Sequence, residues 1–361
     1  MMKTVAEVSS NKLRGGFYTP DSLVRICLDR IAELCGSRMG LDVLEPCVGD
    51  GAFLRGLANH PLERAVNRFL GIEILDSEAQ KCREVAEATP FDATILTTSS
   101  LEWAVSTQSD FDVVIGNPPF VRFQFISKED VFAAERLCHR LGLSYRGVSN
   151  LWIPILLGAL NRLRLGGSMA LVVPAEIFTG VSAGQVRAWL VSRFESLKID
   201  MFEPGSFPDV LQEVVVLSGK RTEMRALHLA VGTRSTKVQF IDHAGPKVQR
   251  RFSHNVAHDT SVWTKYLLTP TQLNALKEAE NLPSIQCFGR IAKLEVSIVT
   301  GANEFFTVDS ADVAAYDLYE WAEPLLPRIR HASGLIFDDS DYKALLEEGV
   351  KAWLLNFSGH H

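Results

Sequence analysis

The segment Asn117-Pro118-Pro119-Phe120 carries the most specific chemistry in this sequence. It directly follows the apolar run Phe111–Gly116, which is typical of a buried strand. Each proline fixes φ and lacks an N–H, so the corner is rigid and the backbone carbonyl of Pro118 has no neighbouring N–H to bind. A side-chain amide, a free carbonyl and a flat ring are the groups that can hold a planar base through its exocyclic amine. A turn that only ends a strand is the alternative reading of this motif taken alone.

A glycine-rich turn between a strand and a helix indicates a second binding site. The strand 41–44 is followed by Glu45-Pro46-Cys47-Val48-Gly49-Asp50-Gly51 and then by a helical pattern. Glycine lets a ligand approach the backbone, and ligands of doubly wound sheets bind at the carboxyl ends of the strands. A dinucleotide fold would need a third glycine where Leu54 stands. A carboxylate at Glu45 suits a cation better than a pyrophosphate, and S-adenosylmethionine carries an ammonium and a sulfonium.

The segment Gly71-Ile72-Glu73-Ile74 ends the next predicted strand. An acidic residue at such a strand tip can accept hydrogen bonds from both hydroxyls of a ribose. Ile74, beside it, can cover one face of an adenine. For Glu73 the alternative is a simple strand cap.

The elements that must position these residues follow from the hydrophobic pattern. Residues 1–219 alternate short apolar runs with helical patterns, which predicts an α/β fold with a parallel sheet. We expect strands at Leu41–Leu44, Phe69–Ile74, Ala93–Thr97, Val113–Ile115, Met169–Val173 and Val214–Leu217. We expect helices at Asn150–Leu165 and at Pro20–Cys35, the latter capped by Thr19 with Pro20 as its first residue.

The pattern changes after about residue 245. The stretch Ala244–Asp259 is loop-like and basic, Thr269–Ala279 is helical and Ile291–Thr300 is strand-like. We therefore expect two domains, 1–245 and 246–361.

The composition excludes several classes of protein. The chain has 361 residues, 47% of them hydrophobic and 22% charged, which is globular. It lacks an apolar run near the roughly 20 residues of a membrane span, and it lacks a signal-peptide pattern, so we expect a cytoplasmic protein without a membrane partner. Six cysteines without a C-x-x-C pair argue against structural zinc, and we expect no metal. The net charge of −6 does not indicate nucleic-acid binding. The basic excess from Lys220 to Lys265 fits either a phosphate-contacting face or a solvated surface.

In their order and spacing, the motifs resemble the gamma class of DNA adenine-N6 methyltransferases, the TaqI-like enzymes of restriction-modification systems. The matching segments are Phe17-Tyr18-Thr19-Pro20, Leu44–Gly51, Gly71–Ile74, Asn117–Phe120, Asn150–Trp152, Leu165–Glu176, Phe207-Pro208 and Ile298–Phe306. This resemblance implies a class I SAM-dependent methyltransferase fold, which is a Rossmann-like, doubly wound, mostly parallel seven-stranded sheet. A smaller and incomplete α+β target-recognition domain would follow it.

The resemblance also implies roles for individual residues. The methionine end of the cofactor would contact Tyr18, Thr19, Glu45, Pro46, Cys47, Val48, Gly49 and Gly51. Glu73 would hold its ribose and Ile74 its adenine. The target amine would donate to Asn117 and to the Pro118 carbonyl, with Pro119 stiffening the corner and Phe120 and Phe207 bracketing the flipped base.

Three departures from the family are visible in the sequence, and the first is that the recognition domain is short. An acid that often follows the third strand is replaced by Ser99 and Ser100, so that a hydroxyl would substitute for it, and Leu75 stands where an Asp is common.

The predicted reaction is transfer of a methyl group from S-adenosylmethionine to the N6 amine of a flipped adenine in double-stranded DNA. A cognate restriction endonuclease is a candidate partner, and the sequence carries no signal for an oligomeric state. The corner 117–120 contains no cysteine, which disfavours the cytosine-C5 route. The alternatives are an RNA or protein-glutamine N-methyltransferase and a non-catalytic DNA-binding specificity subunit.

Overall fold

The computed structural model describes residues 18–121, 127–144, 150–207, 213–222, 235–244, 247–258, 261–286, 288–292, 302–332, 334 and 336–357. The chain divides into two compact units, Met1–Asn281 and Leu282–His361. Each unit is described by itself.

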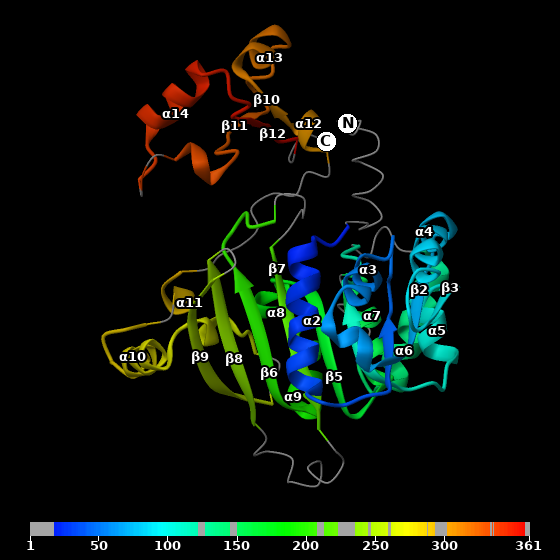
Figure 1. The fold of residues 1–361 in the computed structure, drawn as a ribbon. Helices are drawn as coiled ribbons and strands as arrows, with labels where there is room; N and C mark the ends of the chain where they lie inside the picture. Colours follow the sequence, from blue (N-terminus) through cyan, green and yellow to red (C-terminus); the bar gives the residue numbers. More distant parts are fainter. Residues whose placement is uncertain are drawn as a thin grey trace. The chain divides into compact units, whose positions relative to one another are not determined.

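The first unit is built on one nine-stranded sheet with the order β3-β2-β1-β4-β5-β7-β6-β8-β9 (Figure 1). Its strands are β1 Leu41–Glu45, β2 Val66–Glu73, β3 Asp92–Thr97, β4 Phe111–Gly116, β5 Leu163–Pro174, β6 Phe194–Phe202, β7 Val214–Arg221, β8 Ser235–Ala244 and β9 Lys247–Ala257. Neighbours from β3 through β5 are parallel, β7 runs antiparallel between β5 and β6, and β8 is parallel to β6. The strand order reverses between β1 and β4, where the carboxyl ends of open α/β sheets bind their ligands.

Helices cover both faces of this sheet. They are α2 Asp21–Cys35, α3 Ala52–Ala58, α4 Asp76–Ala86, α5 Ser100–Ser106, α6 Lys128–Arg140, α7 Trp152–Asn161, α8 Glu176–Thr179, α9 Gly184–Arg193 and α10 Pro270–Glu280, with short 3-10 turns at Pro61–Ala65 and Thr264–Leu267. Alternate residues of β5 enter two different hydrophobic cores: Ala170 and Val172 join α2 and α3, whereas Leu171 and Val173 join α7 and α9. Because side chains alternate across a strand, these two cores lie on opposite faces.

The sheet has nine strands rather than the seven expected. The prediction of a loop at Ala244–Asp259 was wrong, because Lys247–Ala257 forms strand β9, an antiparallel partner of β8. Strands β8 and β9 extend the sheet beyond β6. The sequence analysis also missed strands β6 and β8. The helix expected at Asn150–Leu165 is shorter: α7 ends at Asn161, and β5 begins at Leu163. The helix expected at Thr269–Ala279 is confirmed as α10.

The second unit contains a small antiparallel sheet with the order β10-β12-β11. Its elements are α11 Phe288–Ile291, α12 Asn303–Phe306, β10 Thr307–Val308, α13 Ser310–Ala315, β11 Ala322–Pro324, a 3-10 turn Ile329–His331, α14 Asp339–Glu347 and β12 Trp353–Leu355. Most of the strand expected at Ile291–Thr300 lies outside the described residues, and Ile291 itself ends α11. The boundary expected after residue 245 falls between β8 and β9, whereas the compact units divide after Asn281.

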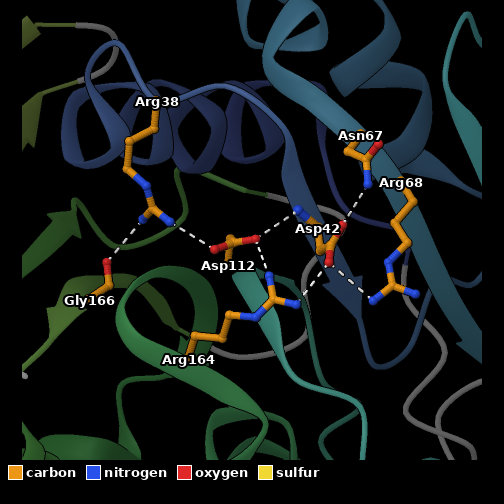
Figure 2. A network of polar contacts seen from close by, with 7 residues as sticks. All are labelled: Arg38, Asp42, Asn67, Arg68, Asp112, Arg164 and Gly166. Carbon is orange, nitrogen blue, oxygen red and sulfur yellow. Dashed lines mark hydrogen bonds and ion pairs between the residues drawn. The ribbon is translucent and has the colours of Figure 1, made fainter.

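An ionic network ties together the amino ends of β1, β4 and β5 (Figure 2). Asp112 accepts hydrogen bonds from Arg38 (2.8 Å), from Arg164 and from the backbone N–H of Asp42 (3.1 Å). The carboxylate of Asp42 accepts from Asn67 (3.0 Å), Arg68 (3.1 Å) and Arg164 (3.0 Å). Burial alone would raise the pKa of Asp42, but these donors hold it below its ordinary value. The network lies at the amino ends of these strands, opposite the carboxyl-end edge marked by Glu45, Glu73 and Asn117 (the crevice), and its contacts join neighbouring strands of the sheet.

Among the described residues, no helix is long and apolar enough to cross a membrane.

Candidate active site

Glu45, the last residue of β1, is a buried carboxyl group with an unused hydrogen-bonding atom. Its side chain is almost fully enclosed, and its Oε2 has no hydrogen-bond partner among the described residues. Burial raises the pKa of Glu45 well above its ordinary value, and the nearby carboxylates of Asp50 and Glu73 raise it further. A Cβ on Gly116, which has φ +145°, would lie 3.2 Å from Cγ of Glu45. An unpaired buried carboxyl oxygen is costly, so this position suits a bound cation.

The turn from β1 to α3 is tied to the end of β2. The N–H of Val48 donates to the Ile72 carbonyl (2.9 Å), and the N–H of Gly49 donates to Oε2 of Glu73 (3.0 Å). Gly49 (φ +52°) and Gly51 (φ +86°) adopt left-handed backbone that strains residues with a Cβ. The glycines are therefore required for the turn; Gly49 borders open space, whereas a Cβ on Gly51 would lie 3.1 Å from Sγ of Cys82.

Glu73 lies where the sequence analysis placed it, at the carboxyl end of β2. Its Oε1 accepts from the N–H of Leu75 (2.9 Å) and its Oε2 from Gly49. Burial raises the pKa of Glu73, and these backbone hydrogen bonds oppose that shift. The neighbouring side chain of Ile74 is exposed, so it is accessible to a ligand. Binding of ribose by Glu73 and of adenine by Ile74 remains a prediction.

The two serines after β3 have different partners. The hydroxyl of Ser100 donates to the Pro46 carbonyl and lies 3.5 Å from Sγ of Cys47, so it supports the β1–α3 turn. The hydroxyl of Ser99 donates to Oδ1 of Asp130 at 2.5 Å. Asp130, in the first turn of α6, was missed by the sequence analysis. Its only signal is local, since Ser127 caps that helix by accepting from the Asp130 N–H (3.1 Å).

Asn117 follows β4, and its amide forms a hydrogen bond with Thr19. The Nδ2 group donates to the hydroxyl of Thr19 at 3.1 Å, whereas the buried Oδ1 has no partner among the described residues. Thr19 was expected to cap α2, but the N-cap of that helix is Pro20 and it lacks a side-chain cap bond. Because Thr19 takes the amide donor, the oxygen is the atom left to bind a ligand. The structure thus brings Thr19 to the Asn-Pro-Pro corner.

The aromatic residues of the predicted site lie at the same edge of the sheet. Phe120 and Phe207 are both partly buried and pack against the same hydrophobic core. Phe207 contacts Phe202 edge-on with ring centroids 5.0 Å apart, and Phe202 stacks on His243 at 5.2 Å. The predicted stacking of a base between Phe120 and Phe207 is untested.

Tyr18 lies beside α4. Its hydroxyl donates to Glu78 (3.4 Å) and accepts from Lys81 (3.5 Å), and its side chain is half-exposed. These contacts place Tyr18 next to the helix that follows β2, and its contact with the cofactor stays a prediction. Among the described residues there is also no cluster of His, Cys, Asp and Glu that could hold a metal ion.

Comparison with known proteins relates two long segments to one functional class. Residues 63–207 match the family described as Eco57I restriction-modification methylase, and residues 260–361 match the C-terminal domain of Type II methyltransferase M.Eco57I. Type II methyltransferase M.AccI of Acinetobacter calcoaceticus is 20% identical over 352 residues, covering 94% of this chain and 62% of that protein. The two family matches and the match to M.AccI support a restriction-modification methyltransferase. Type II methyltransferase M.TthHB8I of Thermus thermophilus is 31% identical over 170 residues, or 46% of this chain and 36% of that protein. This chain therefore spans less than two thirds of the length of either relative.

Solved structures confirm the predicted fold class. A Listeria monocytogenes protein described as a class I S-adenosylmethionine-dependent methyltransferase superposes with a TM-score of 0.50 and 16% identity, covering 63% of this chain and 66% of that one. The type IIG restriction endonuclease BpuSI gives 0.52 with 14% identity over 94% of this chain and 43% of its own. The DrdV–DNA complex gives 0.58 with 15% identity over 87% and 38%. The first unit has the class I SAM-dependent methyltransferase fold.

Proposed function

We propose that this protein is a DNA methyltransferase that transfers a methyl group from S-adenosylmethionine to the N6 amine of a flipped adenine. The observation that carries the proposal is the Asn117 amide, whose nitrogen is bound by Thr19 and whose buried oxygen is unpaired within the described residues. An acceptor fixed in this way at the carboxyl edge of the sheet suits an amine donor. The matches to restriction-modification methylases support DNA as the substrate.

The residues at the crevice fit the proposed cofactor. The fold and the matched family support S-adenosylmethionine, which supplies an activated methyl group when bound. The unpaired carboxyl oxygen of Glu45 suits a positively charged ligand, and Gly49 in the following turn borders open space. Glu73 and Ile74 stand at the next strand end, where they would hold the ribose and the adenine.

An adenine amine is a weak nucleophile, because its lone pair is delocalised into the ring. The segment Asn117–Phe120 would have to raise that nucleophilicity. The Asn117 oxygen and the Pro118 carbonyl would accept the two amine hydrogens and localise that lone pair. Thr19 would keep the amide oxygen directed at the substrate. The amine is inaccessible in a duplex, so the base must be extruded at a cost of a few kcal/mol. Stacking on Phe120 and Phe207 would offset part of that cost.

The alternatives predict different substrates. An RNA or protein-glutamine N-methyltransferase would use the same corner on another planar amine or amide, and a specificity subunit would bind DNA without transfer. The similar proteins M.AccI and M.TthHB8I are Type II methyltransferases, which favours the DNA enzyme. We further propose that the enzyme acts in the cytoplasm and is paired with a cognate restriction endonuclease.

The test is the substitution Asn117→Ala. We expect methyl transfer from radiolabelled cofactor to adenine-containing DNA to fall at least 100-fold, because removal of one preorganised polar group at a reacting centre costs about that much. Cofactor affinity, measured by calorimetry, should change less than threefold. The matched control is Asn59→Ala, which removes the same atoms from an exposed helix end. Equal turnover by the Asn117 variant and the wild type would refute the assignment.

A further inference from the structure

Strand β9 is divided into an exposed basic half and a buried apolar half. All five residues from Lys247 to Arg251 are exposed, and three of them are Lys or Arg. Beyond them, Phe252 and Val256 are buried and join the core. The strand is the last in the sheet order, so its outer edge pairs with no strand of the described residues. Charged residues on an edge strand, lysine above all, are also a common protection against aggregation.

The basic half lies at the same edge of the sheet as the candidate active site. Strand β8 is parallel to β6, with His243 opposite Phe202, and the antiparallel β9 begins with Lys247 opposite Ala244. The ring of Phe202 links His243 to Phe207. A continuous line of contacts therefore runs from the predicted base-binding aromatic residue to the start of β9.

Two of the three cations are available to a ligand. Arg250 is bound by Asp242 (2.6 Å) and lies over the ring of Phe252 (4.9 Å). For Lys247 and Arg251 the described residues provide no ion-pair partner. The pairing register shifts between Asp242 and His243, leaving Gln249 as the extra residue of a bulge. A bulge at a sheet edge bends the strand and redirects its side chains.

We propose that the exposed half of β9, Lys247–Arg251, binds the phosphate backbone of the duplex whose base is presented to Asn117. The inference rests on the proposed function. A base extruded into the crevice leaves its flanking phosphates along the same edge of the sheet. The net charge of the chain is −6, so a local row of cations is specific to this surface and does not follow from overall composition. Lys and Arg contacts of this kind position a duplex without reading its sequence.

The experiment measures duplex affinity against salt concentration by fluorescence anisotropy, with the full chain and a fluorescein-labelled duplex of mixed sequence. For Lys247→Ala/Arg251→Ala, the slope of log K against log salt should become shallower by about 2, since each phosphate contact contributes about 0.9. The matched control, Lys220→Ala/Lys237→Ala, removes two exposed cations at the opposite edge, where both face Ser196 on β6. Its slope should equal that of the wild type.

The outcomes separate this inference from the proposed function. An unchanged slope in the β9 variant, or an equal change in the control, refutes the phosphate-binding surface and leaves the proposed function intact. A wild-type protein that binds no duplex refutes both. Cofactor affinity measured by calorimetry should stay within twofold in both variants, which shows that they fold. The proposal is supported if the β9 variant folds and its slope of log K against log salt becomes shallower, while the slope of the control equals that of the wild type.

Discussion

At the scale of single residues, the crevice concentrates unfavourable local interactions that a ligand would relieve. Glu45 is buried among other carboxylates, and Asn117 has a buried oxygen without a partner among the described residues. A folded chain without ligand loses stability at each such atom, because buried polar groups normally have hydrogen-bond partners. Functional sites are expected where side chains depart from the usual pattern of burial and hydrogen bonding.

Glu45→Gln should therefore stabilise the cofactor-free protein at neutral pH. The raised pKa of Glu45 means that the folded state binds this proton more tightly than the unfolded state does. The stability that this bound proton gives to the folded state is complete below the unfolded pKa of about 4.3. It is lost as pH rises toward the pKa of Glu45 in the folded state. At pH 8 we expect the free energy of unfolding to rise by about 1–3 kcal/mol, the cost of an unsatisfied buried group.

Denaturant unfolding at pH 5 and pH 8 would measure this effect, with the exposed Glu84→Gln as the control. The gain should be larger at pH 8. Calorimetry of the same variant should show cofactor affinity reduced about tenfold or more, since a charged hydrogen bond contributes about 1.5–3 kcal/mol. A variant that is both less stable at pH 8 and unimpaired in binding would contradict this account of Glu45.

The sequence identified the residues of the crevice but not all of their partners. Glu45, Glu73 and Asn117 were identifiable because Glu45 and Glu73 end strands β1 and β2 and Asn117 directly follows β4. The contact of Thr19 with Asn117 spans 98 positions, and that of Ser99 with Asp130 spans 31. Such pairs depend on how helices α2 and α6 pack, which local patterns do not specify. Thr19 also had a plausible local role as a helix cap, and its tertiary role replaced it.

At the scale of elements, the strands that were predicted contain short apolar runs, such as Val113–Ile115 of β4, Met169–Val173 of β5 and Val214–Leu217 of β7. Strand β6 was missed because it carries charge: Asp200 is fully buried there, held by Arg30 (2.6 and 2.8 Å) and by His243 (2.6 Å). A buried carboxylate paired across two other elements looks like a solvated residue in the sequence. Strand β9 was missed for a related reason, since its first five residues are exposed and resemble a loop.

The ionic network of Figure 2 gives a prediction for the opposite edge of the sheet. Asp112→Ala leaves the N–H of Asp42 without its acceptor and removes one of the two carboxylates that bind Arg164, so the free energy of unfolding should fall by about 1–3 kcal/mol, the cost of a buried donor left unsatisfied. Arg68→Ala removes an arginine whose side chain is 45% exposed and should cost under about 1 kcal/mol. Chemical denaturation would measure both changes.

Two further readouts identify the role of this network. Neither variant should alter cofactor affinity, because the network lies away from the crevice. The lowered pKa of Asp42 stabilises the fold above its unfolded pKa of about 3.9, and that contribution is lost as pH falls through the folded value. The wild type should thus lose stability on acidification more steeply than Asp42→Asn does. Equal costs for Asp112→Ala and Arg68→Ala would show that the network contributes little.

At the scale of the whole molecule, the packing of strands β8 and β9 determines where the first compact unit ends. Residues of β9 and the following turn, including Phe252 and Trp263, are buried in the same core as Phe240 of β8. The rings of Phe240 and Phe252 stack at 5.4 Å, and Leu273 of α10 joins them. A cut after residue 245 would expose this core, whereas the compact unit extends to Asn281.

Two truncated chains test this division. Residues 1–281 should unfold in one cooperative transition and bind cofactor with an affinity within about threefold of the full chain. Residues 1–245 should aggregate or lack that transition, because burying a single large aromatic side chain contributes about 1.5–3 kcal/mol and several such residues would be exposed. Calorimetric melting and cofactor titration of both chains give the readout. A 1–245 chain that melts cooperatively and binds cofactor would place the domain boundary between β8 and β9 and would show that β9 is not needed for the fold of the first unit.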